Sequence, residues 1–240
     1  MEKIEKFQIL ISCLLITLGV LISSIVFASK ISNDNITVTG SASKIVKSDS
    51  AKLGFDISSR AQTQKEAFAI LKKQTPEVEK FLLSKGIQKQ DIDIKTMHGY
   101  YNYKTNAQGY STNEVSSYSA NLNFEVKSKD VDLVKKLSTE IQELTNNGIQ
   151  ISIFNPEYFY SDLASIKIDL LNEASKDARQ RAQSMLSATN AKVGKVKSMR
   201  MGVFQITPID SNSVSNMGLN DTTTIDKKVT AVANVVFNVK

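Results

Sequence analysis

Hydrophobic and polar residues alternate along much of this chain, a pattern typical of half-buried β-strands. The clearest alternating stretches are residues 51–57, 118–126, 149–153 and 229–239. Weaker strand patterns occur at residues 36–40, 91–103 and 192–203. Residues 106–114 (NAQGYSTNE) have the turn-forming composition of a hairpin tip. The pattern therefore predicts a strand-rich protein that contains an antiparallel hairpin.

Other segments carry hydrophobic residues at the spacing of one helix face. They are residues 62–85, 130–147 and 162–188. Asp130 has the residue type of a helix N-cap, and Gly148 that of a C-terminal stop. Within the first segment, Thr75-Pro76 predicts either a kink or the start of a second helix.

The last third of the chain adds one further helix feature and one irregular segment. Ala174, Ala178 and Ala182 form a stripe of small side chains, which we interpret as core packing close against a sheet. Residues 205–227 are rich in Ser, Asn, Thr and Asp, and this composition predicts a mobile loop.

The order strand–helix–strand–strand occurs twice, at residues 51–127 and 149–239. It predicts an α+β fold of two quasi-equivalent halves with antiparallel sheets, each covered on one face by helices. The halves would span about 34–128 and 149–240, with the helix at 130–147 linking them. The uncovered sheet faces would then favour oligomers.

An apolar segment precedes this domain. Residues 7–29 contain no charge and follow Lys3 and Lys6, so residues 1–30 are expected to be a transmembrane anchor or a signal segment. The length favours a retained, single-pass anchor, with the N-terminus inside and the remaining domain outside. The small residues before Ser29 favour the alternative, a protein secreted after cleavage following Ala28.

Composition and charge exclude several classes of protein. The chain has 240 residues, of which 41% are hydrophobic, enough for a substantial core. Its one cysteine, Cys13, lies in the apolar segment, so the domain has no disulfide framework. Residues 31–240 hold 27 basic and 22 acidic residues, a mild excess that is scattered along the sequence. Nucleic-acid binders instead gather Lys and Arg on one face, so we expect no nucleic-acid partner.

The densest basic stretch runs from Lys192 to Arg200. Basic residues at such spacing are typical of the solvated face of a strand. Weak attraction to anionic polymers of the cell envelope is the alternative.

Three segments resemble the SIMPL-domain family, which includes bacterial periplasmic immunogenic proteins. They are ITVTGSASKIVKSDSAKLGFDI (36–57), YSANLNFEVKSKDVDLVKKLSTEIQELTNNGIQ (118–150) and EASKDARQRAQSMLSATNAKVGKV (173–196). The last is the most specific, with alanine at every fourth position and then Gly-Lys-Val. The resemblance covers residues 34–240. It departs at Ser48-Asp49, where the family usually has Pro-Asp, and this bears on the local geometry rather than on the fold.

The resemblance implies an exported or membrane-anchored α+β protein. Some members resemble building blocks of ring-like or channel-like assemblies, and several are linked to envelope or oxidative stress tolerance. The resemblance supplies no catalytic residue set that could be assigned to this chain.

The residues themselves offer little catalytic chemistry. His98 is the only histidine, and the chain has no G-x-S-x-G motif and no second ligand suited to a typical zinc site. Asp91 and Asp93 provide two carboxylates where calcium needs six to eight oxygens, so we interpret them as a solvated strand face. We therefore expect no enzymatic activity, no catalytic residues, no cofactor and no metal site.

The unusual feature is a concentration of tyrosines. Five of the seven tyrosines lie within residues 100–118, namely Tyr100, Tyr101, Tyr103, Tyr110 and Tyr118. They are candidates for an assembly interface, because tyrosine combines apolar area with a polar group. Cross-strand pairing within the hairpin explains them equally well.

The sequence thus favours a non-catalytic extracytoplasmic protein that self-assembles as a homo-oligomer. It would contact the membrane through residues 7–29 and support envelope integrity or stress tolerance. The alternative is a monomeric binding module of the envelope for a cell-wall polymer or a small solute.

Overall fold

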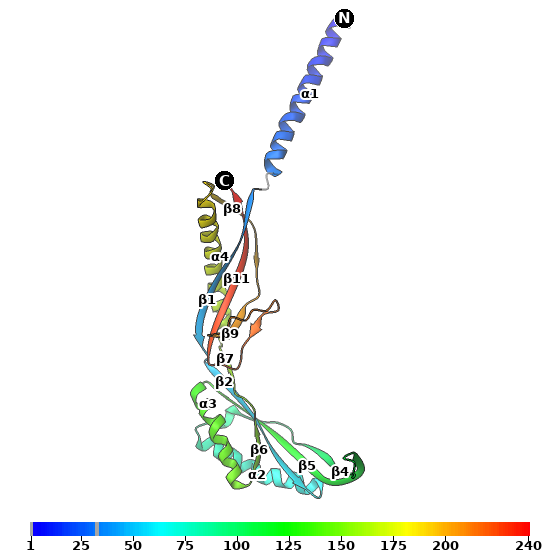
Figure 1. The fold of residues 1–240 in the computed structure, drawn as a ribbon, viewed down its shortest axis with the longest axis vertical. Coiled ribbons are helices and arrows are strands. Elements are labelled where there is room, and N and C mark those ends of the chain that lie inside the picture. Colours follow the sequence, from blue (N-terminus) through cyan, green and yellow to red (C-terminus); the bar gives the residue numbers. More distant parts are fainter. Residues whose placement is uncertain (1, 32–33) are drawn as a thin grey trace. The chain divides into compact units, whose positions relative to one another are not determined.

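The computed structural model describes residues 2–31 and 34–240, with the side-chain environments of residues 11–25 and 34–240. The chain combines helices with largely antiparallel sheets, so the predicted α+β class is confirmed (Figure 1). The helices are α1 (Glu2–Ile31), α2 (Gln64–Ser84), α3 (Val131–Glu140) and α4 (Leu163–Ser187). Short 3-10 helices are η1 (Lys89–Asp91) and η2 (Ile141–Asn147).

The strands alternate with these helices along the chain. They are β1 (Asn35–Lys47), β2 (Ser50–Ala61), β3 (Ile92–Ile94), β4 (His98–Thr105), β5 (Ser111–Ser128), β6 (Gln150–Ile153), β7 (Glu157–Phe159), β8 (Val193–Met201), β9 (Gln205–Pro208), β10 (Leu219–Asn220) and β11 (Asp226–Val239). Each predicted strand and helix has a counterpart, because hydrophobic periodicity is a local property of each element.

The chain folds into two compact units that interleave along the sequence. The first unit comprises residues 1–41, 172–202 and 232–240, and the second comprises 42–171 and 203–231. In the first unit, β11 pairs with β1 and, antiparallel, with β8. Ala174, Ala178 and Ala182 are fully buried there, which confirms the predicted packing role of the alanine stripe.

The second unit contains a six-stranded sheet in the order β3-β5-β2-β6, with β4 on β5 and β7 on β2. Along β2 and β5, buried side chains alternate with half-exposed ones. The buried hydrophobic side chains all lie on one face of the sheet, which α2 and α3 cover. The core on that face includes Leu53, Phe55, Ile57, Leu122, Phe124, Leu71, Leu82, Val134 and Leu137. Phe55 and Phe124 stack in parallel with ring centroids 5.0 Å apart. The opposite face is polar and half-exposed.

One strand joins an unexpected sheet. Residues 150–153 were expected to open the second half, yet β6 pairs antiparallel with β2, and Ile151 lies opposite Ile57. The sheets therefore do not follow the predicted boundary between 34–128 and 149–240, and the equivalence of these halves stays a prediction.

Helix α2 is continuous through Pro76, so the alternative of a second helix is wrong, and the kink stays a prediction. The Thr63 hydroxyl accepts a hydrogen bond from the Glu66 N–H, and the Glu66 carboxylate accepts one from the Thr63 N–H. Together these two bonds form a complete capping box at the start of α2. The Thr75 hydroxyl donates to the Leu71 carbonyl at 2.8 Å, one turn earlier. No second helix begins at Thr75.

The prediction of a mobile loop at residues 205–227 is wrong for β9, β10 and the start of β11, whereas residues 209–218 form no helix or strand and their mobility stays a prediction. Gln205, Ile206 and Thr207 are buried in β9, which pairs antiparallel with β11. Asp221 and Lys227 form an ion pair with side chains 9% and 3% exposed. Polar composition identifies residues suited to turns, but here these residues satisfy each other within the structure.

Candidate functional site

Three of the five tyrosines form one surface on the β4–β5 hairpin. Tyr101 lies opposite Tyr118, and their rings meet edge to face with centroids 5.0 Å apart. The register shifts between Asn102 and Tyr103, so that Tyr103 lies opposite Val115. The rings of Tyr101 and Tyr103 are neighbours, with centroids 6.4 Å apart. We refer to Tyr101, Tyr103, Tyr118 and Val115 as the tyrosine face.

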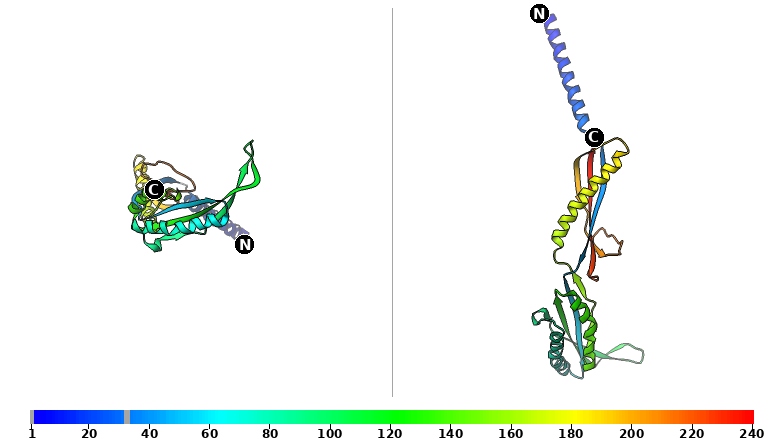
Figure 2. Two further views of the ribbon diagram at one scale, coloured as in Figure 1. Left: turned by 90° about the horizontal axis from the view of Figure 1, so that it is seen from below. Right: turned by 90° about the vertical axis from the view of Figure 1, so that its left-hand side faces the viewer.

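The tyrosine face is solvent-accessible at its centre. Tyr101 and Tyr103 are 52% and 47% exposed, although Tyr101 already packs on Tyr118. The hairpin reaches beyond α2 and α3 of the same unit (Figures 1 and 2). Cross-strand pairing therefore exists within the chain, and about half of each of these two rings stays available for another contact.

The other two tyrosines lie elsewhere. Tyr100 is opposite Ser119, so that it alternates with Tyr101 and faces the other side of the sheet. Tyr110 precedes β5 at the hairpin tip, where Asn106 forms the turn with Gly109 at a positive φ of 84°. The hairpin tip predicted at 106–114 is confirmed for residues 106–110, since β5 begins at Ser111, but the five tyrosines do not form a single cluster.

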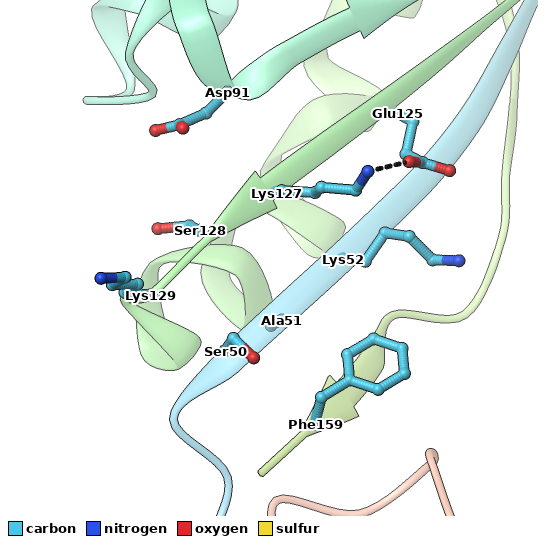
Figure 3. A pocket seen from close by; sticks show the side chains of 9 residues that line it. All are labelled: Ser50, Ala51, Lys52, Asp91, Glu125, Lys127, Ser128, Lys129 and Phe159. Atoms are coloured by element: carbon cyan, nitrogen blue, oxygen red, sulfur yellow. Dashed lines mark ion pairs between the residues drawn. The ribbon is translucent and has the colours of Figure 1, made fainter. Parts of the chain in front are cut away.

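The open face of the six-stranded sheet carries a groove of about 460 Å³ (Figure 3). Lys52 pairs with Glu157 at 2.9 Å, and Lys127 pairs with Glu125 at 2.8 Å. The Phe159 ring forms a wall, with its centroid 6.0 Å from the Lys52 ammonium. The remaining lining comes from Ser50, Ala51, Asp91, Ser128 and Lys129.

The charges in the groove are largely balanced by ion pairs. The hydrogen bond from Lys127 lowers the pKa of Glu125 despite partial burial, and Lys95 and Lys52 add to this effect. Both Lys52 and Lys127 already hold carboxylates, so an anionic ligand would compete with Glu125 and Glu157 for them. The groove has the composition of a binding surface for a polar ligand with an apolar part.

The other candidate residues lie apart from one another. His98 is exposed at the start of β4, opposite Asn121. Asp91 ends η1 and lines the groove, whereas Asp93 lies in β3 and contacts Lys95, which lowers the pKa of Asp93. Among the described residues, His, Cys, Asp and Glu form no group of three or more suited to a metal ion.

Ser48 and Asp49, where the sequence departs from the expected Pro-Asp, connect three segments of the second unit. The Ser48 N–H donates to the Ile225 carbonyl at 2.8 Å, a bond that proline has no N–H to make. The Asp49 carboxylate accepts from the hydroxyl and the N–H of Ser161, and the hydroxyl bond lowers the pKa of Asp49. The effect of the departure on the local geometry stays a prediction.

A family model decides the classification. The SIMPL model, described as a protein of unknown function (DUF541), matches residues 36–237. The chain belongs to the SIMPL family. The match includes residues of both units and all the elements from β2 to β10. A search of curated proteins found no match.

Helix α1 precedes the SIMPL domain. Within the part of the chain that the structure describes, no helix combines the length and hydropathy of a membrane span. The predicted segment, residues 7–29, extends at both ends beyond the described side chains, and the predicted cleavage point after Ala28 lies outside them as well. Between residues 11 and 25, the large hydrophobic side chains are 44–66% exposed.

Proposed function

We propose that this SIMPL-domain protein is a non-catalytic, extracytoplasmic protein that self-assembles and supports envelope integrity or stress tolerance. The observation that carries the proposal is the tyrosine face. It presents the half-exposed Tyr101 and Tyr103 on a projecting hairpin, where Tyr101 packs between the rings of Tyr103 and Tyr118. Aromatic residues held rigid before binding lose little conformational entropy at an interface, which makes them effective contact residues.

The location proposed is outside the cytoplasm, with α1 as a retained anchor whose N-terminus stays inside. The exposed hydrophobic side chains between residues 11 and 25 support contact with lipid, because an apolar surface of this kind is unfavourable in water. Secretion after cleavage following Ala28 is the alternative. N-terminal sequencing of the native protein distinguishes them, since a start at Ser29 contradicts the anchor.

We propose two partners, a second copy of the chain and the membrane, and we propose that the protein does not bind nucleic acid. Light scattering of the full chain in detergent, corrected for bound detergent, tests whether the chain associates with itself. We expect a particle several times the 26.5 kDa chain mass. A monomer at micromolar concentration would contradict self-assembly.

A matched pair of variants locates the interface. The double variant Tyr101→Ser with Tyr103→Ser removes both exposed rings of the tyrosine face and is expected to reduce the oligomer size. The control double variant Tyr100→Ser with Tyr110→Ser removes two tyrosines of the same hairpin that are at least as exposed, 52% and 72%, but lie outside that face. Equal effects of the two variants would assign the assembly contact to another surface.

The groove favours a second candidate, a monomeric binding module of the envelope. Its volume of about 460 Å³ and its lysines beside Phe159 suit a small solute or a segment of a cell-wall polymer. Soluble muropeptides are a practical probe. Saturable thermal stabilisation that disappears in Lys52→Ala and Lys127→Ala variants would support this candidate, and no shift at millimolar muropeptide would contradict it.

A further inference from the structure

The positive charge of the SIMPL domain is concentrated in its first unit. Counted from the sequence, the second unit holds 19 basic and 19 acidic residues and is neutral. Outside α1, the first unit holds eight basic and three acidic residues, a net charge of +5. The charge is therefore not scattered, as the linear sequence suggested, because the fold brings residues 34–41, 172–202 and 232–240 into one unit.

Strand β8 presents much of this charge. Every residue from 195 to 201 is exposed, so β8 is accessible on both of its faces. Lys195, Lys197 and Arg200 are its basic residues. Among the described residues, β8 pairs with β11 alone, which leaves its other edge as an outer boundary of the sheet.

Hydrophobic side chains alternate with these charges. Val196, Met199 and Met201 are 48%, 49% and 58% exposed. Met199 and Met201 lie opposite the buried Val235 and Ala233, so both lie on the side of the sheet that α4 covers. Because neighbouring residues of a strand face opposite sides, the methionines and the basic side chains flank the outer edge of β8 from the two sides of the sheet. An apolar surface and positive charge therefore meet at that edge, a composition that suits the boundary between lipid headgroups and acyl chains.

The short linker between α1 and β1 limits how far the start of β1 can lie from α1. Helix α1 ends at Ile31 and β1 begins at Asn35, and four residues of extended chain span at most about 14 Å. The Asp34 carbonyl accepts from the Val239 N–H, and Lys192 and Lys240 exchange two backbone hydrogen bonds at 2.8 Å. Lys192 and Lys240 thus lie at the end of the unit where the chain from α1 enters.

We propose that β8 and the adjoining Lys192 and Lys240 bind the surface of an anionic phospholipid bilayer. This inference rests on the proposed insertion of α1, because the short linker then keeps the end of the first unit within about 14 Å of the end of that helix. Each basic residue near an anionic surface raises the ratio of bound to free states about fivefold. The neutral second unit has no comparable attraction.

The test uses the full chain, reconstituted into vesicles of phosphatidylcholine with or without phosphatidylglycerol. A Cys13→Ser variant with Ser198→Cys places a single environment-sensitive fluorophore on β8, and headgroup spin labels on the lipid quench it on contact. We expect quenching in the phosphatidylglycerol vesicles and its loss in about 1 M salt, where the Debye length is about 3 Å. Quenching that is equal without phosphatidylglycerol overturns the inference.

Charge-reversal variants supply the matched control. The triple variant Lys195→Glu, Lys197→Glu and Arg200→Glu is expected to reduce quenching to the level of the phosphatidylcholine vesicles. Its control, the triple variant Lys72→Glu, Lys73→Glu and Lys89→Glu, changes the total charge equally through exposed residues of the neutral unit and is expected to keep the quenching. An equal loss in both variants overturns the assignment to β8. Circular dichroism verifies the folding of each variant.

Two further readouts separate this inference from its alternatives. A carbonate wash of the same vesicles tests the insertion of α1, since protein that is washed off contradicts the anchor. Protein that resists the wash while its label stays unquenched in phosphatidylglycerol vesicles contradicts the surface contact alone. A larger response of the label to soluble polyphosphate than to phosphatidylglycerol would assign β8 to an anionic polymer and overturn the inference.

Discussion

Gly40 of β1 lies against the backbone of Ala174 in α4, so closely that a Cβ atom at residue 40 would stand 2.1 Å from the Ala174 carbonyl oxygen. The same Cβ would lie 2.4 Å from the Ala178 backbone nitrogen. Helix and strand thus meet through a glycine on one side and alanines on the other. The alanine stripe and Gly40 are two halves of a single close contact within the first unit.

Replacement of Gly40 by alanine is expected to destabilise the protein by about 3 kcal/mol, because backbone atoms of a helix cannot move aside as a side chain can. Urea unfolding followed by circular dichroism measures the loss. The control is Gly54→Ala in β2, where the nearest atom, at 3.0 Å, belongs to the half-exposed ring of Phe154. That ring has room to rotate, so the control should change stability by less than about 1 kcal/mol. Similar losses in both variants would contradict the close contact.

The Asp221–Lys227 pair is expected to be essential for the order of residues 209–226. Lys227 donates to the Asp221 carbonyl oxygen at 2.8 Å and to its carboxylate at 3.2 Å. Asp221→Asn leaves a buried ammonium without its counter-charge and should cost about 3 kcal/mol of unfolding free energy. Glu114→Gln, which breaks the exposed pair with Lys104, is the control and should leave the urea midpoint unchanged. A midpoint for Asp221→Asn equal to that of the control would disprove the role.

Acid should weaken the same pair in a defined pH range. Burial raises the pKa of Asp221, but hydrogen bonds from Thr224, Thr223 and Lys227 outweigh it and place the folded-state pKa well below the ordinary 3.8. A carboxyl with a lowered folded-state pKa contributes stability that is fully present above the unfolded-state pKa and is lost as the pH falls through the folded value. We therefore expect the stability difference between wild type and Asp221→Asn to be constant near neutral pH and to shrink below about pH 4. A difference that stays constant down to about pH 2 would refute this linkage.

Pro76 is expected to cost stability in its present position. It lies inside α2 and lacks the N–H that would bond to the carbonyl one turn earlier, while its own side chain is exposed. Pro76→Ala restores that hydrogen bond, and the greater freedom of the unfolded chain offsets part of the gain. We expect a net stabilisation of about 1 to 2 kcal/mol, measured by thermal and urea unfolding. The neighbouring exposed variant Glu77→Ala should show no such gain, and a destabilised Pro76→Ala would contradict the prediction.

Local elements of this fold could be predicted because their signals lie within the elements themselves. The alternation at 118–126 corresponds to the buried alternate residues of β5, and the Asp130 cap and the Gly148 stop delimit α3 and η2. Ala174, Ala178 and Ala182 indicated close packing through their spacing alone. The predicted family follows from the same local segments and is confirmed by the match over 36–237.

The candidate surfaces could be predicted only in part. The sequence identified the tyrosines, but their separation into the tyrosine face, Tyr100 and Tyr110 depends on strand register and on the irregularity after Asn102. The groove had no sequence signal, because Lys52, Lys127, Glu125 and Phe159 come from β2, β5 and β7 and meet only when these strands pair. No local pattern distinguishes a lysine that lines a groove from one on an open surface.

By itself, the sequence determined the α+β class, the helices and strands, the apolar segment at 7–29 and the SIMPL family, because composition and periodicity record which residues are buried in each element. The tertiary structure alone decided which sheet β6 joins, why Gly40 must be a glycine, how Asp221 is satisfied by Lys227 and where the positive charge gathers. Each of these depends on residues far apart in the chain, whose proximity arises only when long-range contacts offset the entropy of closing the loops between them.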